Sequence, residues 1–519
     1  MSPHIVGADL LLISPIIVLL VGSMVGVLVE AFVPVTGRRN VQVVLSMVSI
    51  MAALVGWVYT FLHVDPAQPR VLGGGEYLLD GLTIWSQLVI LIIGLLAVGM
   101  MADAGVDSAF AAQPADIPGS RAEELSLRKG YQRTELFPLA LFSLIGLLVF
   151  PAAGSFLVLF IALEVISLPL YVLSATARHR RLISQEAAAK YFVLGAFSSA
   201  FFLMGGAILF GYSGSLYLGD IARASGHGVG GVTMLSLGVV LVLIGLLFKT
   251  GAAPFHAWTP DVYQGAPTPI TGYMAAGVKA AAFLALARFF FLIGVPVSWN
   301  LAVFLWIVAI LTMIVGTFWG IVQEDVKRML AFSSIAHAGF VLIAIIAKDD
   351  HSTSAILFYM LAYGVATVGA FAVIALVRRV SEDGALGGEA NQIADWAGLG
   401  KTHPWLAAAM MVFLLSFAGI PLTAGFVGKF VVFASGIRGG ATVLVVIAVI
   451  ASAITAYYYF RLARTMYMEA PSGKVEVANT QGIIPTIIAV CALATIALGV
   501  LPQFVLQGFD LATIVVAFT

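Results

Sequence analysis

The feature that most constrains this chain is a succession of long apolar runs from one end of the sequence to the other. A helix needs about 20 apolar residues to cross the roughly 30 Å hydrocarbon layer of a membrane. Fourteen runs fit a spanning helix, at 10–32, 41–63, 79–102, 136–151, 154–175, 187–212, 232–254, 268–293, 300–321, 329–347, 353–378, 405–436, 441–467 and 482–501. The sequence therefore predicts an all-α polytopic membrane protein.

Composition excludes the other broad classes of protein. Of the 519 residues, 61% are apolar and 10% are charged, whereas soluble domains are about 45–50% apolar and about 25% charged. The 26 basic and 26 acidic residues balance, so no net field attracts nucleic acid. The single cysteine, Cys491, can form no internal disulfide. We expect a lipid bilayer around the chain and no redox centre or metal within it.

The basic residues predict the orientation of the helices. Loops that follow even-numbered helices hold only Arg70, Arg223, Lys348 and Arg438. Loops that follow odd-numbered helices hold seventeen: Arg38, Arg39, Arg121, Arg128, Lys129, Arg133, Arg178, Arg180, Arg181, Lys327, Arg328, Arg378, Arg379, Lys401, Arg461, Arg464 and Lys474. Because cytoplasmic loops are enriched in Lys and Arg, both termini are expected outside. The first run has no basic residue ahead of it and is expected to span the membrane rather than be a signal peptide.

Several charged side chains lie inside the predicted spans. Each costs about 2.5–3.5 kcal/mol at the centre of a membrane helix, so Glu164 and four lysines together cost on the order of 12–18 kcal/mol. Total folding stabilities are typically about 5–15 kcal/mol. These side chains are therefore expected to face a hydrated interior and to have a function, whereas Arg288, nearer a helix end, is expected to be a structural anchor.

Glu164 in the fifth span and Lys249 in the seventh are predicted to form a pair. Pro254 has no N–H and leaves the carbonyl of Thr250 without its helical partner, so the seventh helix is expected to break there. A broken helix at membrane depth survives only where it lines a cavity or is buried in protein. Desolvation favours a neutral amine and a nearby carboxylate favours the ammonium, a balance that suits a proton carrier.

The twelfth span repeats this combination of a lysine and a helix break. Its apolar run of about 32 residues would measure about 48 Å as a straight helix, which exceeds the membrane. Gly419, Pro421, Gly425 and Gly428 mark the expected interruption, and Lys429 follows. Interrupted spans at matching places in two halves point to inverted repeats around a central ion path.

The five-helix offset between the two interrupted spans defines the expected organisation. Helices 4–8 and 9–13 are predicted to be inverted repeats, with helices 7 and 12 broken. The chain then divides into 1–102 with three helices, a cytoplasmic loop at 103–135, repeats at 136–293 and 300–467, and a terminal helix within 482–519. The loop reads either as an inert insertion or as a functional segment.

Three further residues, Lys279, His337 and Lys190, are candidates for a proton path, and His256 is a supporting candidate beside Pro254 and Pro421. Lys279 lies among small residues in the eighth span, which let helices approach closely. His337 takes the place of Glu164 in the second repeat and serves either as a proton relay or in packing. Lys190 follows Glu186 by four residues, so a local ion pair and a relay role are both open. His256 lies in the proline-rich segment after the seventh span, which reads mainly as a rigid loop.

Five strings resemble one family. The strings LEVISLPLY, EAAAKYF, FKTGAAPFHAWTPDVYQGAP, KRMLAFSSIAHAGF and GIPLTAGFVGKF are similar to the antiporter-like membrane subunits of proton-pumping NADH:quinone oxidoreductase, respiratory complex I. The resemblance runs over about 150–435. Two features separate the chain from two members of this family. Lys429 stands where subunit M usually has glutamate, and the sequence ends at Thr519 without the long lateral helix of subunit L.

The resemblance implies a function and a set of residue roles. Protons would pass from Lys249 through Lys279 and His337 to Lys429, with Glu164 paired to Lys249 and Lys190 as a connecting group. The chain would lie in a bacterial plasma membrane beside other membrane subunits and, through them, a peripheral NADH-oxidising arm. FMN, iron–sulfur clusters and quinone are expected in partner subunits. A subunit of a cation/proton antiporter or of a membrane-bound hydrogenase is the alternative, and a non-pumping scaffold does not explain the buried charges.

Overall fold

The structure, a computed structural model, places the predicted spans in helices. It describes residues 7–65, 68–103, 110, 120–128, 134–178, 180–224, 228–293, 298–380, 386–471, 473–478, 482–512 and 514. Within this part of the chain, twelve helices are long and apolar enough to cross a membrane, and the fourth and twelfth spans are the shorter apolar helices at Leu136–Ala152 and Pro404–Ala418. Apolar helices thus occupy all fourteen predicted places, and the all-α polytopic architecture is confirmed.

The first three spans and the last one flank the two predicted repeats. They are α2 (Ser14–Phe32), α3 (Val35–His63), α4 (Gly81–Met101) and α21 (Ile483–Val500). Four short helices join spans or flank them, and a fifth follows α21; they are α1 (Gly7–Leu12), α5 (Arg121–Arg128), α9 (Leu218–Arg223), α17 (Leu399–Thr402) and α22 (Gln503–Phe509).

The first repeat runs from α6 to α13. Its elements are α6 (Leu136–Val149), α7 (Phe156–Ser174), α8 (Arg181–Ser213), α10 (Gly231–Thr250), α11 (Trp258–Gly265), α12 (Thr268–Tyr273) and α13 (Lys279–Ile293). The boundary between the fourth and fifth spans is a 3-10 turn at Phe150–Ala152. The sixth helix begins at Arg181, six residues before the predicted start, because its first turns are polar and project beyond the apolar run.

The second repeat has the same order of elements. It comprises α14 (Ser298–Ile321), α15 (Val326–Ala347), α16 (Ser352–Leu376), α18 (Pro404–Ala418), α19 (Ala424–Arg438) and α20 (Thr442–Met468). The first two helices of each repeat pack against each other, and so do the third and the broken fourth. Successive membrane helices run in opposite directions, so two helices an odd number of places apart are antiparallel. Equivalent helices of the two repeats are five places apart, and the second repeat is therefore inverted relative to the first.

Both predicted helix breaks are present. The helix α10 ends at Thr250, Gly251 adopts a φ of +73°, and α11 begins only at Trp258. The amide of Ala253 in the break donates a hydrogen bond to Thr312 Oγ1 on α14, at 2.9 Å. In the twelfth span α18 ends at Ala418 and α19 starts at Ala424. The amide of Gly425 donates a hydrogen bond to Ser416 Oγ at 3.0 Å, so protein groups contribute to satisfying the interrupted backbone.

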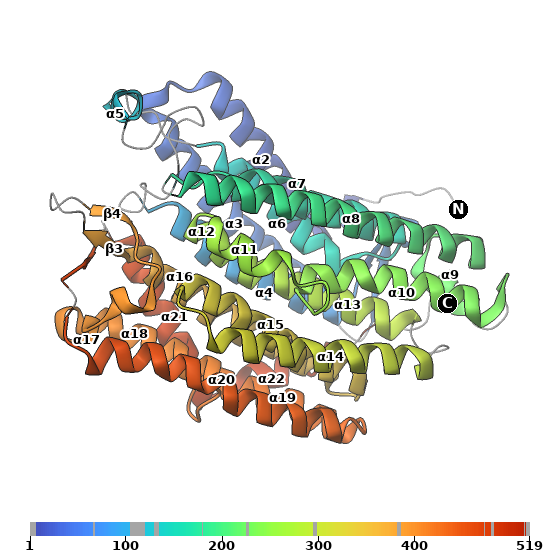
Figure 1. The fold of residues 1–519 in the computed structure, drawn as a ribbon. Helices are drawn as coiled ribbons and strands as arrows, with labels where there is room; N and C mark the ends of the chain where they lie inside the picture. Colours follow the sequence, from blue (N-terminus) through green and yellow to red (C-terminus); the bar gives the residue numbers. More distant parts are fainter. Residues whose placement is uncertain are drawn as a thin grey trace.

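Three helices form the centre of the bundle. The segment Thr268–Ile293, which contains α12 and α13, is buried along its length, as are α15 and α16. Each is apolar on all sides, as expected for a helix surrounded by other helices. Figure 1 shows α15 and α16 between the first repeat and the helices α18 to α20. The centre therefore belongs to the helices that carry Lys279 and His337.

A small sheet was not predicted. Strand β3 (Val377–Val380) pairs antiparallel with β4 (Leu386–Glu389) and with β5 (Val475–Val477), and a second hairpin joins β1 (Arg70–Leu72) and β2 (Tyr77–Leu79). The strands are three or four residues long, too short for a clear alternation. The predicted eleventh helix therefore stops at Leu376 rather than at residue 378.

The loops fall at two opposite ends of the bundle. The helices α5 and α17 and the strands β3 and β4 lie at one end, and α9 lies at the other (Figure 1). The loops that follow odd-numbered and even-numbered spans therefore lie at opposite ends, as the count of basic residues assumed. Most of the predicted 103–135 loop lies outside the described residues, although Asp103 Oδ2 accepts a hydrogen bond from the amide of Ile484 at 2.9 Å.

Candidate proton path

Glu164 and Lys249 lie on neighbouring helices and each bonds to a serine. Ser199 Oγ on α8 donates to Glu164 Oε1 at 2.6 Å. Lys249 Nζ donates to Ser167 Oγ at 2.6 Å, and Ser167 lies three residues after Glu164 on α7, about one turn further. No direct Glu164–Lys249 ion pair occurs among the described residues in this state, so the approach of the two charges stays a prediction.

Aromatic rings complete the surroundings of Lys249. Its side chain is 3% exposed, which makes a purely snorkelling lysine inconsistent with the structure. The ammonium lies 5.7 Å from the ring centre of Tyr171 and 5.4 Å from that of Tyr191. Cation–π contacts of this kind offset part of the cost of removing a cation from water.

Lys279 joins the two repeats. A π turn at Met274–Val278 directly precedes it, and such turns often occur at functional sites. Its ammonium donates to both the carbonyl and the hydroxyl of Ser334 on α15 and lies 5.9 Å from the ring centre of Tyr363. The side chain is 3% exposed, so these neutral groups replace its water.

His337 lies one turn beyond Ser334 on the same helix. Its Nδ1 forms a hydrogen bond with Tyr359 Oη at 2.6 Å, and its Nε2 forms one with Tyr459 Oη at 3.2 Å. Tyr459 Oη also bonds to Ser333 Oγ, at 2.5 Å. Both ring nitrogens therefore face hydroxyl groups, which can donate or accept, so the ring can exchange a proton on either side.

Lys429 uses the backbone groups that the twelfth break sets free. Its ammonium donates to the carbonyls of Phe417 at 2.8 Å and Ala418 at 3.0 Å, and to Ser452 Oγ at 2.7 Å. The last carbonyls of a helix have no helical partner and carry partial negative charge. Gly419 has a φ of +82°, and a Cβ there would lie 2.9 Å from the Lys429 Cδ. Pro421 lies inside the break, as predicted.

Lys190 belongs to an ion-pair cluster at the end of α8 that lies opposite α9. Its ammonium lies 2.7 Å from Glu186 Oε1 and 2.7 Å from Asp261 Oδ2, and Arg328 on α15 lies 2.6 Å from Asp261 Oδ1. Burial alone raises the pKa of Asp261, but the hydrogen bonds from Lys190 and Arg328 outweigh burial and hold that pKa below its ordinary value. Asp261 thereby links the two repeats.

His256 lies between α10 and α11, in the segment around Pro254. Burial lowers the pKa of His256 below its ordinary value, and a hydrogen bond with the backbone of Pro254 only partly offsets this. Desolvation therefore favours the neutral ring. The structure brings Lys279, His337 and Lys429 around α15, whereas Lys190 belongs to the cluster with Asp261 and His256 lies in the break between α10 and α11.

Sequence reasoning missed the hydroxyl groups that link these residues. Tyr359, Tyr363 and Tyr459 surround His337, and Ser334 and Ser199 contact charged groups. These side chains carry no charge, so they do not stand out in an apolar run, although polar side chains in membrane helices usually form hydrogen bonds across helices. It also missed Asp80, which accepts two hydrogen bonds from Arg288, at 2.8 and 2.6 Å, with both side chains buried.

Comparison with known proteins places the chain in a family. Residues 153–455 match the family model described as NADH:quinone oxidoreductase/Mrp antiporter, TM. A curated relative from Beutenbergia cavernae, NADH-quinone oxidoreductase subunit N, is 48% identical over 515 residues, covering 96% of this chain and 97% of the relative. A chain of respiratory complex I from Thermus thermophilus is 31% identical with a TM-score of 0.77, covering 96% of this chain and all of that chain.

A structure of an Mrp complex from Dietzia sp. contains a chain with a TM-score of 0.79. That chain is 19% identical and the match covers 97% of this chain and 96% of that one, so it shows the shared fold alone. The fold and its buried charges define an antiporter-like membrane subunit. Within that class, the chain belongs to the subunit N family of NADH-quinone oxidoreductase. The expected resemblance is confirmed, and the antiporter alternative is not favoured.

Proposed function

We propose that the chain is a proton-translocating subunit in the membrane arm of an NADH-quinone oxidoreductase. The observation that carries the proposal is the bonding of Lys279 and Lys429. Each is at most 5% exposed, and each ammonium bonds to hydroxyl and carbonyl oxygens rather than to a carboxylate. A permanent buried charge without a counter-charge is costly, which favours groups that gain and lose a proton.

The described contacts suggest how protons would move. Lys249 would receive a proton beside Glu164, and Lys279 would pass it through Ser334 and His337 towards Lys429. The tyrosine hydroxyls on His337 would carry the proton between donors and acceptors. Quinone reduction elsewhere in the complex would drive the transfer, with NADH, FMN, iron–sulfur clusters and quinone held by partner subunits.

Purification of the complex tests the assignment of partners. An affinity-tagged full-length chain, extracted from its own bacterial membrane in mild detergent, should bring down the other membrane subunits and the NADH-oxidising arm. Mass spectrometry of the eluate identifies them, with an untagged strain as the control. Recovery of cation/proton antiporter subunits in place of quinone-reductase subunits would reject the proposal.

The proposed orientation places both termini outside a bacterial plasma membrane. In a Cys491→Ser background, Ala122→Cys in α5 and Gln503→Cys in α22 offer exposed labelling positions. Because the basic loops are expected in the cytoplasm, a membrane-impermeant maleimide should label position 503 in intact cells. Position 122 should react only after the membrane is opened. Labelling of both positions from one side would contradict the topology.

A further inference from the structure

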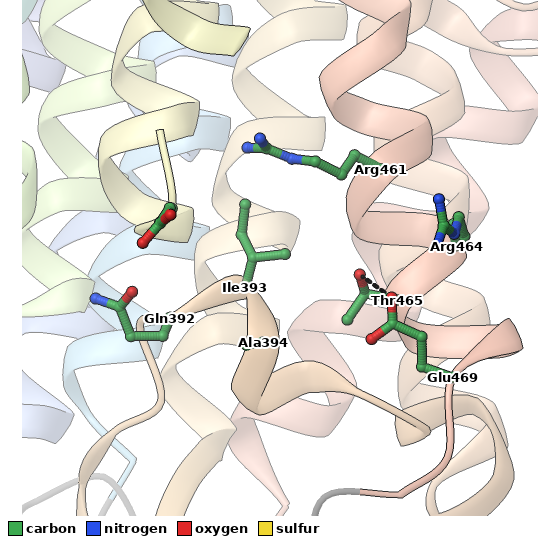
Figure 2. A pocket seen from close by; sticks show the side chains of 8 residues that line it. Gln392, Ile393, Ala394, Arg461, Arg464, Thr465 and Glu469 are labelled. Atoms are coloured by element: carbon green, nitrogen blue, oxygen red, sulfur yellow. Dashed lines mark hydrogen bonds between the residues drawn. The ribbon is translucent and has the colours of Figure 1, made fainter. Parts of the chain in front are cut away.

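Two hollows meet at the end of α20 that lies near the sheet. The first has a volume of about 840 Å³ and is lined by Arg461, Arg464 and Glu469 of this end, by Glu324 after α14, and by Gln392 to Ala394. Figure 2 shows Arg461 and Arg464 on one helix, with Arg461 reaching towards the side of the hollow on which the Gln392–Ala394 segment lies. It therefore holds two guanidinium groups and two carboxylates.

The two arginines differ in how they are held. Arg461 donates hydrogen bonds to the carbonyls of Ile321 and Gln323, so its guanidinium is fixed in the wall. Arg464 is exposed, and among the described residues it has neither a hydrogen bond nor an ion pair. Thr465 Oγ1 donates to Glu469 Oε1 at 3.3 Å, the contact drawn in Figure 2. Arg464 thus presents a free cation at the rim.

The second hollow shares both arginines but is otherwise apolar. Met411 of α18 and Tyr457, Phe460 and Met468 of α20 contribute to its walls, and its volume is about 830 Å³. The side chains of Tyr457, Phe460 and Met468 are 59%, 46% and 78% exposed. A polar hollow and an apolar groove therefore meet at Arg464.

Beyond the second hollow, the outward face of α20 remains apolar and exposed. Ile450 is 56% exposed, and Ile450, Tyr457, Phe460 and Arg464 follow one another at helical spacing on one face. At about 1.5 Å per residue, the path from Arg464 to Ile450 is about 21 Å long. This exceeds half of the roughly 30 Å hydrocarbon layer, the depth that the acyl chain of one leaflet occupies.

We propose that these two hollows bind one glycerophospholipid with a zwitterionic, ammonium-bearing headgroup such as phosphatidylethanolamine. The phosphate bonds to Arg464 and Arg461, as expected for a basic pocket between helices at the membrane surface. The headgroup ammonium lies towards Glu469 and Glu324, and an acyl chain follows the Tyr457–Phe460 groove. The four side chains sum to no net charge, which matches a zwitterion better than an anionic lipid. This site does not depend on the proton path.

Lipid retention by the purified complex tests the proposal. After delipidation in detergent, the complex is incubated with phosphatidylethanolamine, phosphatidylglycerol, phosphatidylcholine or inorganic phosphate, and native mass spectrometry counts the molecules bound to the full-length chain. Phosphatidylethanolamine should bind with one molecule per chain and should outcompete the others. Arg464→Gln should weaken its binding about tenfold, the low end for a charge-assisted hydrogen bond.

A second variant separates the headgroup from the acyl chain. Phe460→Ser removes one wall of the groove and should also lower phosphatidylethanolamine retention several-fold, without changing Arg464. The matched controls are Arg223→Gln on α9 and Phe192→Ser on α8, because both residues are exposed and Figure 1 shows α8 and α9 away from α20. Both controls should retain the lipid as the unaltered chain does.

Three results would overturn the assignment. Equal retention in Arg464→Gln, Phe460→Ser and the controls would exclude a lipid site here. Preferential binding of phosphatidylglycerol or of inorganic phosphate would show an anion site in place of a zwitterionic one. A photo-crosslinker at Met468 that captures a partner polypeptide and no lipid in the intact complex would show that a subunit covers this face.

Discussion

Glu164→Gln and Lys249→Met are each expected to abolish proton pumping or to lower it strongly in the assembled complex. In the state in which the two side chains approach, removing one leaves the other charge without compensation. The penalty stays below the roughly 3–5 kcal/mol of a fully buried pair because Glu164 is half-buried. Lys249 is almost fully buried and Glu164 only partly so, so the larger effect is expected from removing Glu164 while Lys249 remains. Proton-to-electron stoichiometry in proteoliposomes measures the result.

The geometry explains why Glu164→Gln is expected to act on transfer rather than on folding. The glutamine amide oxygen can still accept the hydrogen bond that Ser199 donates to Glu164, so the α7–α8 contact persists. What is lost is the negative charge one turn from Ser167, the acceptor of the Lys249 ammonium. The uncompensated cation then lacks the partner that balances its release and uptake of a proton.

A matched control variant removes a carboxylate from α8, the helix that packs against α7. Glu186 forms an exposed i,i+4 ion pair with Lys190, and exposed pairs contribute about 0–1 kcal/mol. Glu186→Gln should therefore leave pumping close to normal. Unchanged stoichiometry in both Glu164→Gln and Lys249→Met, with intact assembly, would refute the proposed role of the pair.

The spans and the helix breaks could be predicted because each depends on local sequence. Apolar length alone locates a membrane helix, and Pro254 and Pro421 each remove a helical hydrogen bond because proline has no N–H. The sheet that joins β3 to β5 could not be predicted, because its pairing depends on two loops that lie nearly 100 residues apart. Each strand is stable only after the helices have placed the loops together.

The charged residues of the candidate site could be predicted from the sequence, but the hydrogen bonds that link them could not. A buried lysine such as Lys279 stands out in an apolar run because of its cost. The bond of Lys279 to Ser334 depends on how α13 and α15 cross, which the sequence does not specify. The same holds for Asp80, which caps α4 and meets Arg288 only because the fold brings α4 and α13 together.

Lys429→Arg is expected to block pumping while the complex still assembles. Arginine keeps the positive charge but remains protonated at any working pH, whereas a proton carrier must release its proton in each cycle. The carbonyls of Phe417 and Ala418 and the hydroxyl of Ser452 can accept from a guanidinium as they do from an ammonium. Binding of the cation is thus retained and its deprotonation is removed.

Comparison of Lys429→Arg with Lys429→Met separates two roles for this residue. If Lys429 exchanges protons, both variants lose pumping; if it supplies only a fixed charge next to the α18 carbonyls, Lys429→Arg pumps and Lys429→Met does not. Lys348→Arg, at an exposed lysine on the loop after α15, controls for the substitution itself and should pump normally. Proton-to-electron stoichiometry gives the activity, and a native gel shows that each complex has assembled. A fully active Lys429→Arg complex would remove Lys429 from the chain of proton carriers and leave it as an electrostatic cap on the broken helix.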